Sequence, residues 1–201
     1  SHVHVKACSV VMVMMVVIFV VIAIRDDRAD HRAGGFHARA DDRAGDIDCR
    51  ARHGHGYSVF EHNSRGIALE LTQFVPLADP VKLSRLKLVN GTARARRLTV
   101  TAYVEWTLGT SRATSGIVTA IDPATSAFFA RNPHHSEFAG HVAFLDLLGV
   151  QRSWTGDRTE FLGRNGGLGR PAALASSAAL SRQVGGGLDP CGVLQTEIHL
   201  A

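Results

Sequence analysis

The stretch RRLTVTAYVEW, residues 96–106, decides the fold class because its hydrophobicity alternates with a period of two. Every second residue from Leu98 to Trp106 is apolar, whereas the residues between them, from Thr99 to Glu105, carry polar groups. Successive side chains of a β-strand point to opposite faces of a sheet. The pattern therefore predicts a half-buried antiparallel strand with Trp106 in the core.

Similar short strands are predicted on both sides of this stretch. Residues 66–75 and 81–89 alternate in the same way, although the phase in the second slips between Leu83 and Leu86, as at a β-bulge. Turn-forming pairs separate the strands, and only residues 171–180 show a weak helical pattern. The sequence thus predicts an all-β fold, an antiparallel β-sandwich. Its further strands are expected at 116–121, 127–131, 141–148 and 192–200.

The last predicted strand runs to Ala201 with no element after it to pair with its edge. We therefore expect a sandwich domain over residues 52–201 that is truncated, incomplete at its carboxy end.

The amino-terminal region, residues 1–25, is an apolar segment. Residues 7–24 are 18 consecutive residues without a charge, the lower limit for a helix that crosses a membrane. A membrane span and a buried strand both stay open. If the segment spans, the arginines that follow it hold the rest of the chain in the cytoplasm, tethered to the inner membrane. We expect a cytoplasmic domain in either case.

Residues 26–51 are predicted to be a disordered polar linker, because arginine and aspartate dominate and large apolar side chains are scarce. The composition of residues 1–50 is also typical of a GC-rich gene read out of frame. An artefact of this kind is a further alternative for the amino-terminal region.

Charge and composition exclude several classes of function. The 22 basic and 18 acidic residues leave a net charge of +4, and no basic stripe with interleaved aromatics is present, so nucleic acid is not an expected partner. The three cysteines lack metal-ligand spacing, and His53, His55 and His62 lack a third ligand at a defined spacing. We expect free thiols, no metal and no cofactor.

The motif GDRTEFLGRNG, residues 156–166, is the main candidate for a functional loop. Asp157 and Glu160 are three residues apart, and on a strand or turn they do not converge on one substrate atom, so no catalytic residue is assigned. A structural role is favoured. In that role Gly156 and Gly163 form tight turns, Asp157 accepts hydrogen bonds from local amides, and Phe161 anchors the loop.

The alternative for this motif is contact with a sugar or with a neighbouring domain. Arg158, Arg164 and Asn165 carry planar donors that suit hydroxyls and carboxylates. Trp154, just before the motif, is a candidate platform on which a sugar ring could stack.

Five blocks in register resemble one known family. The resemblance is to the amino-terminal supersandwich domain of glycoside hydrolase family 94, above all to the phosphorylase-like region of cyclic β-1,2-glucan synthases, with cellobiose and chitobiose phosphorylases as more distant relatives. It covers residues 52–201. The blocks are RHGHGYSVFEHNSRGIALELTQFVPLADPVKLSRLKL (52–88), RRLTVTAYVEWTLG (96–109), FFARNP (128–133), GDRTEFLGRNG (156–166) and LDPCGVLQTEI (188–198).

The resemblance implies a supersandwich that precedes an (α/α)6 barrel, which holds the general acid and the phosphate site. Without that barrel, a fragment of a glycoside phosphorylase or glycosyltransferase is expected to be inactive alone. The implied role is a non-catalytic carbohydrate-binding domain that supports the barrel. Its implied partners are a β-glucan or gluco-oligosaccharide, the barrel, and a second copy in a homodimer. Two alternatives stay open, a free-standing carbohydrate-binding module and a membrane-tethered structural protein.

Overall fold

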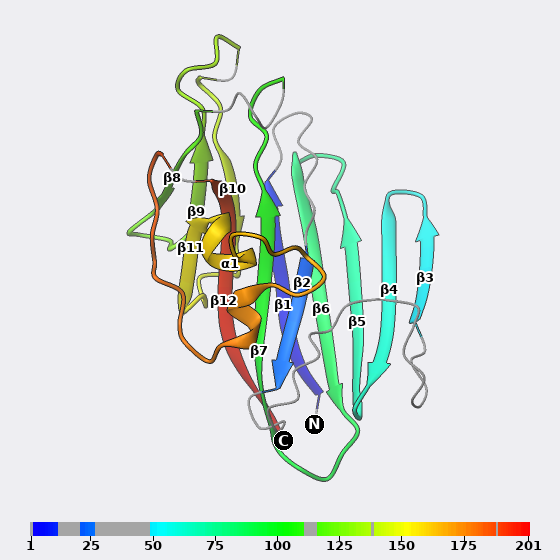
Figure 1. The fold of residues 1–201 in the computed structure, drawn as a ribbon. Coiled ribbons are helices and arrows are strands. Elements are labelled where there is room, and N and C mark those ends of the chain that lie inside the picture. Colours follow the sequence, from blue (N-terminus) through cyan, green and yellow to red (C-terminus); the bar gives the residue numbers. More distant parts are fainter. Residues whose placement is uncertain (1, 12–20, 27–48, 111–115, 138, 188) are drawn as a thin grey trace.

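Two antiparallel β-sheets stack face to face in the computed structural model (Figure 1), which describes residues 2–11, 21–26, 49–110, 116–137, 139–187 and 189–201. Every strand pair among these residues is antiparallel. The predicted all-β sandwich is confirmed.

The larger sheet, sheet A, has eight strands in the order β3-β4-β5-β6-β1-β10-β9-β8. Its strands are β1 (His2–Val11), β3 (Cys49–Gly54), β4 (Tyr57–Ser64), β5 (Ile67–Phe74), β6 (Val81–Asn90), β8 (Val118–Ile121), β9 (Phe128–Arg131) and β10 (Ala143–Asp146). Sheet B has four strands in the order β11-β12-β7-β2. They are β2 (Val21–Asp26), β7 (Arg96–Glu105), β11 (Ser153–Asp157) and β12 (Pro190–Leu200).

Strand β7 is buried on both faces, so the prediction of a half-buried strand was wrong in that respect. Leu98, Val100 and Ala102 belong to its inner, apolar face, and Tyr103 on the opposite face is fully buried as well. The outer face is covered because two short helices, α1 (Arg158–Leu162) and α2 (Ala172–Ala175), form a third layer there.

Strand β12 lies between β11 and β7, so it is not an exposed edge as the sequence analysis expected. It pairs with β7 in ten consecutive positions, from Cys191 opposite Glu105 to Leu200 opposite Arg96. Both sides of the strand are therefore hydrogen-bonded within sheet B.

Strand β6 keeps an unbroken register with β5 from Leu83 to Asn90, so the expected bulge does not interrupt that pairing. The irregularity occurs in its pairing with β1, between Val5 and Cys8. The hydrophobic phase slips because the buried position before Leu86 is a serine, Ser84, while Leu83 occupies the opposite face of the strand.

The described parts of the amino-terminal region are strands of both sheets. Strand β1 pairs with β6 and β10, and β2 pairs with β7. Among the described residues no helix is long and apolar enough to cross a membrane. Residues 12–20 of the apolar segment lie outside the described residues, and the membrane span that the sequence analysis left open is not confirmed. Most of the predicted linker, residues 27–48, lies outside the described residues.

The space between the sheets holds two clusters of buried apolar side chains. One surrounds Trp106, whose ring stacks on Phe128 with centroids 6.3 Å apart, which confirms the prediction that Trp106 is in the core. The other includes Leu88 and Leu98. A third cluster, on the outer face of sheet B, joins Tyr103 and Val193 to residues of the helical layer.

An extended segment, residues 181–185, connects one edge of each sheet, and we call it the strap. The amide of Arg182 donates to the Trp154 carbonyl at 2.9 Å, and that of Gly156 donates to the Gln183 carbonyl at 2.7 Å, both on β11. On β8, the Thr119 amide donates to the Gly185 carbonyl at 3.0 Å. The strap therefore covers two edges that would otherwise be open to pairing with another chain.

Candidate functional site

The motif at residues 156–166 begins at the end of a strand and continues into a helix of one turn. Strand β11 ends at Asp157, and α1 occupies Arg158–Leu162. The Asp157 carboxylate accepts a hydrogen bond from the Thr159 amide at 2.8 Å and so caps the helix. Sequence analysis expected a strand or turn here. The missed signal is Asp157 followed three residues later by Glu160, the spacing of a capping box.

The two glycines named in the sequence analysis have different roles. Gly156 is a buried strand residue and not a turn residue: a Cβ there would lie 2.6 Å from the Thr119 hydroxyl and 3.4 Å from the Gln183 carbonyl. Gly163 ends α1 with φ of 90°, a conformation that favours glycine, and its amide donates to the Thr159 carbonyl. Gly156 thus permits close approach of the strap, and Gly163 permits the turn.

Helix α1 is anchored to sheet B by its apolar side chains. Phe161 is fully buried, and its ring stacks on Tyr103 at a centroid distance of 4.9 Å and an interplanar angle of 22°. Leu162 is buried in the same cluster. The helix is too short to be stable alone, so this packing holds it in place.

Arg158 lies in a polar network at the base of the motif. Its Nε is 3.0 Å from Glu105 Oε1 and its Nη1 is 3.4 Å from Asp189 Oδ2. The Tyr103 hydroxyl donates to the same Glu105 oxygen. Burial, followed by the hydrogen bond to Glu105, raises the pKa of Tyr103 well above its usual range, and the hydrogen bond to Glu105 raises the pKa of Arg158. The network favours a neutral tyrosine beside a charged pair.

The two carboxylates of the motif have separate partners. Asp157 caps α1, whereas Glu160 accepts hydrogen bonds from the Ser181 amide at 2.7 Å and the Ser181 hydroxyl at 2.6 Å. Glu160 therefore ties α1 to the start of the strap. This geometry suits a structural joint between the helix and the edge of the sandwich.

Trp154 lies on the inner face of β11, opposite Leu194 of β12, and packs against the core around Trp106. The guanidinium carbon of Arg182 is 5.0 Å from the centroid of the Trp154 ring. The Trp154 ring is therefore in contact with core residues and with the Arg182 guanidinium, and it does not offer an open face on which a sugar could stack. The ring instead helps to hold the strap through a cation–π contact.

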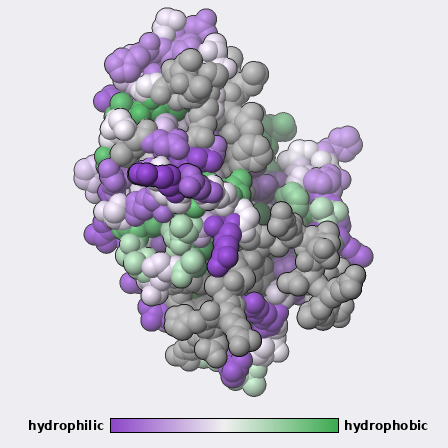
Figure 2. Space-filling view, viewed as in Figure 1, coloured by the Kyte–Doolittle hydropathy of each residue, from purple (hydrophilic) through white to green (hydrophobic). Residues whose placement is uncertain are grey.

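Arg164 and Asn165 are exposed in the turn that follows α1. The Gly166 amide donates to the Gly163 carbonyl at 3.1 Å and closes this turn. The three residues of the motif that were predicted to contact a sugar or a neighbouring domain therefore differ in their surroundings. Arg158 forms ion pairs with Glu105 and Asp189, whereas Arg164 and Asn165 are exposed in the turn. Figure 2 shows hydrophilic residues gathered over the face that carries α1.

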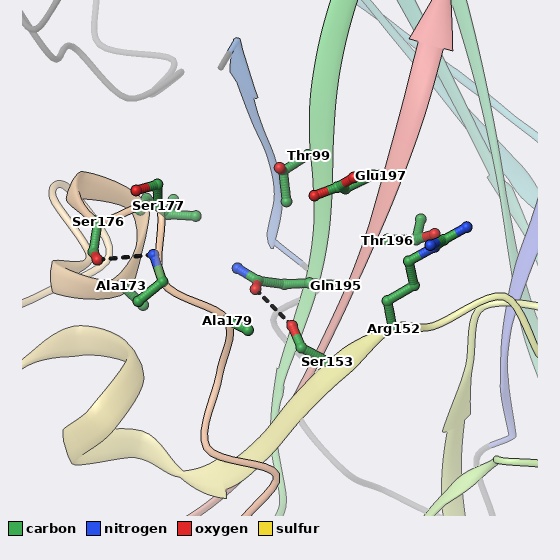
Figure 3. Close-up of a pocket in the computed structure, with 12 residues that line it drawn as sticks. Thr99, Arg152, Ser153, Ala173, Ser176, Ser177, Ala179, Gln195, Thr196 and Glu197 are labelled. Atoms are coloured by element: carbon green, nitrogen blue, oxygen red, sulfur yellow. Dashed lines mark hydrogen bonds between the residues drawn. The ribbon is translucent and has the colours of Figure 1, made fainter.

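A pocket of about 110 Å³ lies beside α2, between the outer face of sheet B and residues 173–179. In Figure 3 the side chains of Thr99, Gln195 and Glu197 point from sheet B toward the segment that contains Ser176 and Ser177. Nothing in the motif predicted this pocket, because its floor comes from β7 and β12 and its wall from a segment with no strong pattern.

The histidines of β3 and β4 lie on the wing of sheet A that extends beyond sheet B (Figure 1). His53 Nδ1 is 2.9 Å from the Ser58 hydroxyl, and His62 Nδ1 is 2.8 Å from Cys49 Sγ. In the part of the chain that the structure describes, no three potential metal ligands form a group. Neither Cys49 nor Cys191 forms a disulfide with another described residue.

Comparison with known proteins identifies the family. The profile described as "Glycosyl hydrolase 94, supersandwich domain" matches residues 24–201. The chain belongs to the glycosyl hydrolase 94 supersandwich family. This supersandwich is 35% identical over 149 residues, 73% of the chain, to the cyclic β-(1,2)-glucan synthase NdvB of Rhizobium meliloti (strain 1021). The family match begins at residue 24 and so includes residues 24–51, which the sequence analysis left outside the resemblance.

The aligned part of this supersandwich corresponds to 5% of the length of NdvB.

Proposed function

We propose that this supersandwich is a non-catalytic domain of a cyclic β-1,2-glucan synthase or related β-glucan phosphorylase, which braces the catalytic barrel and contacts the glucan. One observation carries the proposal. The motif at 156–166 directs both of its carboxylates to structural donors, while Arg164 and Asn165 remain exposed on the turn beyond them.

The carboxylates argue against catalysis within the motif. Glycoside hydrolysis uses two carboxyl groups that flank the scissile bond, and phosphorolysis still needs one carboxyl group that can protonate the leaving oxygen. Asp157 faces the Thr159 amide and Glu160 faces Ser181, so the two groups serve different elements. Neither is free to change its hydrogen bonds without loosening α1 or the strap.

The exposed turn argues for contact with a partner. Its base is fixed by Phe161 in the core and by Arg158 in its ion pairs, so the turn is presented at a defined place. Arg164 supplies planar guanidinium donors and Asn165 supplies an amide, groups that pair with sugar hydroxyls or carboxylates. A preorganised turn loses little entropy when it binds.

The proposal includes a β-glucan as ligand, a barrel in a longer parent chain as partner, a second copy in a homodimer, and a cytoplasmic location. The family resemblance supports the first three points, and the arginines that follow residue 24 support the fourth. A free-standing carbohydrate-binding module is the competing proposal, and it differs in requiring no barrel for glucan contact.

The test is Arg164→Ala in the full-length parent. We expect its transferase or phosphorolysis rate to fall about tenfold, the loss of one charge-assisted hydrogen bond, with an unchanged melting temperature. Arg94→Ala, the same change at an exposed turn between β6 and β7, is the matched control and should leave both values unchanged. An unaltered rate in Arg164→Ala would count against contact through this turn.

A further inference from the structure

The pocket beside α2 has a floor of fixed polar groups. The Ser153 hydroxyl donates to Gln195 Oε1 at 3.0 Å, and Gln195 Nε2 donates to the Thr101 hydroxyl at 3.2 Å. These two bonds set the orientation of the Gln195 amide. A primary amide has two N–H donors, so one donor remains after the bond to Thr101.

Thr99 adds a hydroxyl to this floor. The residue is only 8% exposed and lines the pocket, and Figure 3 shows its side chain on the pocket side of sheet B. A hydroxyl both donates and accepts hydrogen bonds. Thr99 can therefore pair with a polar group that enters the pocket.

Two charged side chains of opposite sign line the pocket, Glu197 and Arg152. Glu197 also pairs with Arg97, with Oε2 and Nη2 2.7 Å apart, and its carboxylate can accept a further hydrogen bond. The opposite wall combines the methyl groups of Ala173, Ala178 and Ala179 with the serines Ser176 and Ser177. Polar groups of the floor thus face a wall that is partly apolar and partly hydroxylic.

This combination fits the edge of a neutral polyol. Vicinal hydroxyls both donate and accept, and the C–H groups between them can lie against methyl groups. The pocket has a volume of about 110 Å³. Such a space accepts the hydroxyls of one sugar unit.

We propose that the pocket formed by Thr99, Gln195 and Glu197 and walled by residues 173–179 binds a single terminal sugar unit of a glucan. The choice of glucose as the sugar rests on the proposed function. The pocket lies on the outer face of sheet B and is separate from the exposed turn at Arg164.

The experiment is an NMR titration of the 201-residue chain with D-glucose and with the β-1,2-linked glucose disaccharide, following the backbone amides of Thr99, Gln195 and residues 173–179. We expect both sugars to shift these amides with a millimolar dissociation constant. Thr99→Val, which removes the hydroxyl at nearly constant shape, should weaken binding by about fivefold to tenfold. Ala178→Leu, which fills the pocket from the wall, should abolish it.

Thr72→Val on β5 is the matched control, because it makes the same chemical change on sheet A and should bind as wild type does. Absence of shifts at the pocket amides, or wild-type affinity in Thr99→Val, would overturn the proposal. Binding in the pocket should not depend on the exposed turn at Arg164. Arg164→Ala should therefore leave the sugar-induced shifts of the pocket amides unchanged. Failure of the pocket and failure of the proposed function are thereby distinguishable.

Discussion

Phe161 of α1 and Tyr103 of β7 stack with their ring centroids 4.9 Å apart, and this contact attaches the motif at residues 156–166 to sheet B. It joins a residue of the motif to the strand that defines the fold. The stability of the domain and the position of the motif therefore depend on the same pair of rings.

Phe161→Ala should lower the free energy of unfolding by about 3–5 kcal/mol, because it leaves a cavity in the cluster under α1. Chemical denaturation of the 201-residue chain measures the change. Arg164→Ala, three residues away and exposed, should be indistinguishable from wild type. If Arg164→Ala unfolds the domain and Phe161→Ala does not, then Arg164 and not Phe161 is the buried residue that anchors the motif.

Arg158→Met should destabilise the domain by about 1–3 kcal/mol, because it leaves the Glu105 carboxylate, only 19% exposed, without its guanidinium partner. Adding Glu105→Gln should restore part of that loss, since the unpaired charge is then gone. Arg52→Met is the matched control. It breaks a more exposed pair with Glu61 and should cost less than ~1 kcal/mol. Equal losses in the two single arginine variants would contradict the network.

Tyr103 makes the stability of the domain depend on alkaline pH. Its pKa is raised in the folded state, so the folded protein keeps the proton that the unfolded chain loses above about pH 10. The stabilisation that protonated Tyr103 gives to the folded state is fully present below that pH, and it is lost as the pH rises further. Tyr103→Phe should be less stable than wild type near neutrality, and the difference should narrow above about pH 10. A constant difference across that range, measured by denaturation, would refute this linkage.

Gly156→Ala should destabilise the domain by about 1–3 kcal/mol, because the added methyl group would lie 2.6 Å from the Thr119 hydroxyl and press on the strap. Thermal unfolding provides the measurement. Gly167→Ala is a suitable control, since a Cβ there meets no atom within 4 Å. A neutral Gly156→Ala would mean that the strap is not packed as closely as described.

The isolated chain should release no glucose 1-phosphate from β-1,2- or β-1,4-linked gluco-oligosaccharides and phosphate. The expectation follows from the structural use of both motif carboxylates. The assay is enzymatic detection of glucose 1-phosphate with a mock preparation alongside. Phosphate-dependent release that scales with protein concentration would disprove it.

Local patterns in the sequence predicted the strands well, because alternation along β7 records which side chains face the core. They did not predict that β7 is also covered on its outer face. That cover depends on Phe161, which is 58 positions after Tyr103 (161 − 103) and is attached to it only by tertiary packing. The periodicity of one strand does not indicate which distant residues pack against it.

The candidate site was predictable in part. The glycines and acids of the motif indicated a structural loop, and the D-x-x-E spacing contained the signal for α1. The roles of Glu105 and Ser181 were not predictable, because their partners Arg158 and Glu160 are distant in the sequence. The pocket at Thr99 was hidden for the same reason.

The central position of β12 in sheet B affects the order in which the domain forms during synthesis. Strands β7 and β11 leave the ribosome well before residues 190–200, yet β12 pairs with both of them and lies between them. Until that last strand emerges, the nascent chain holds two strands that have no contact with each other within sheet B. Pairing across such long sequence separations is slow. The nascent domain thus exposes unpaired strand edges, which are prone to aggregation, until residues 190–200 have been synthesised.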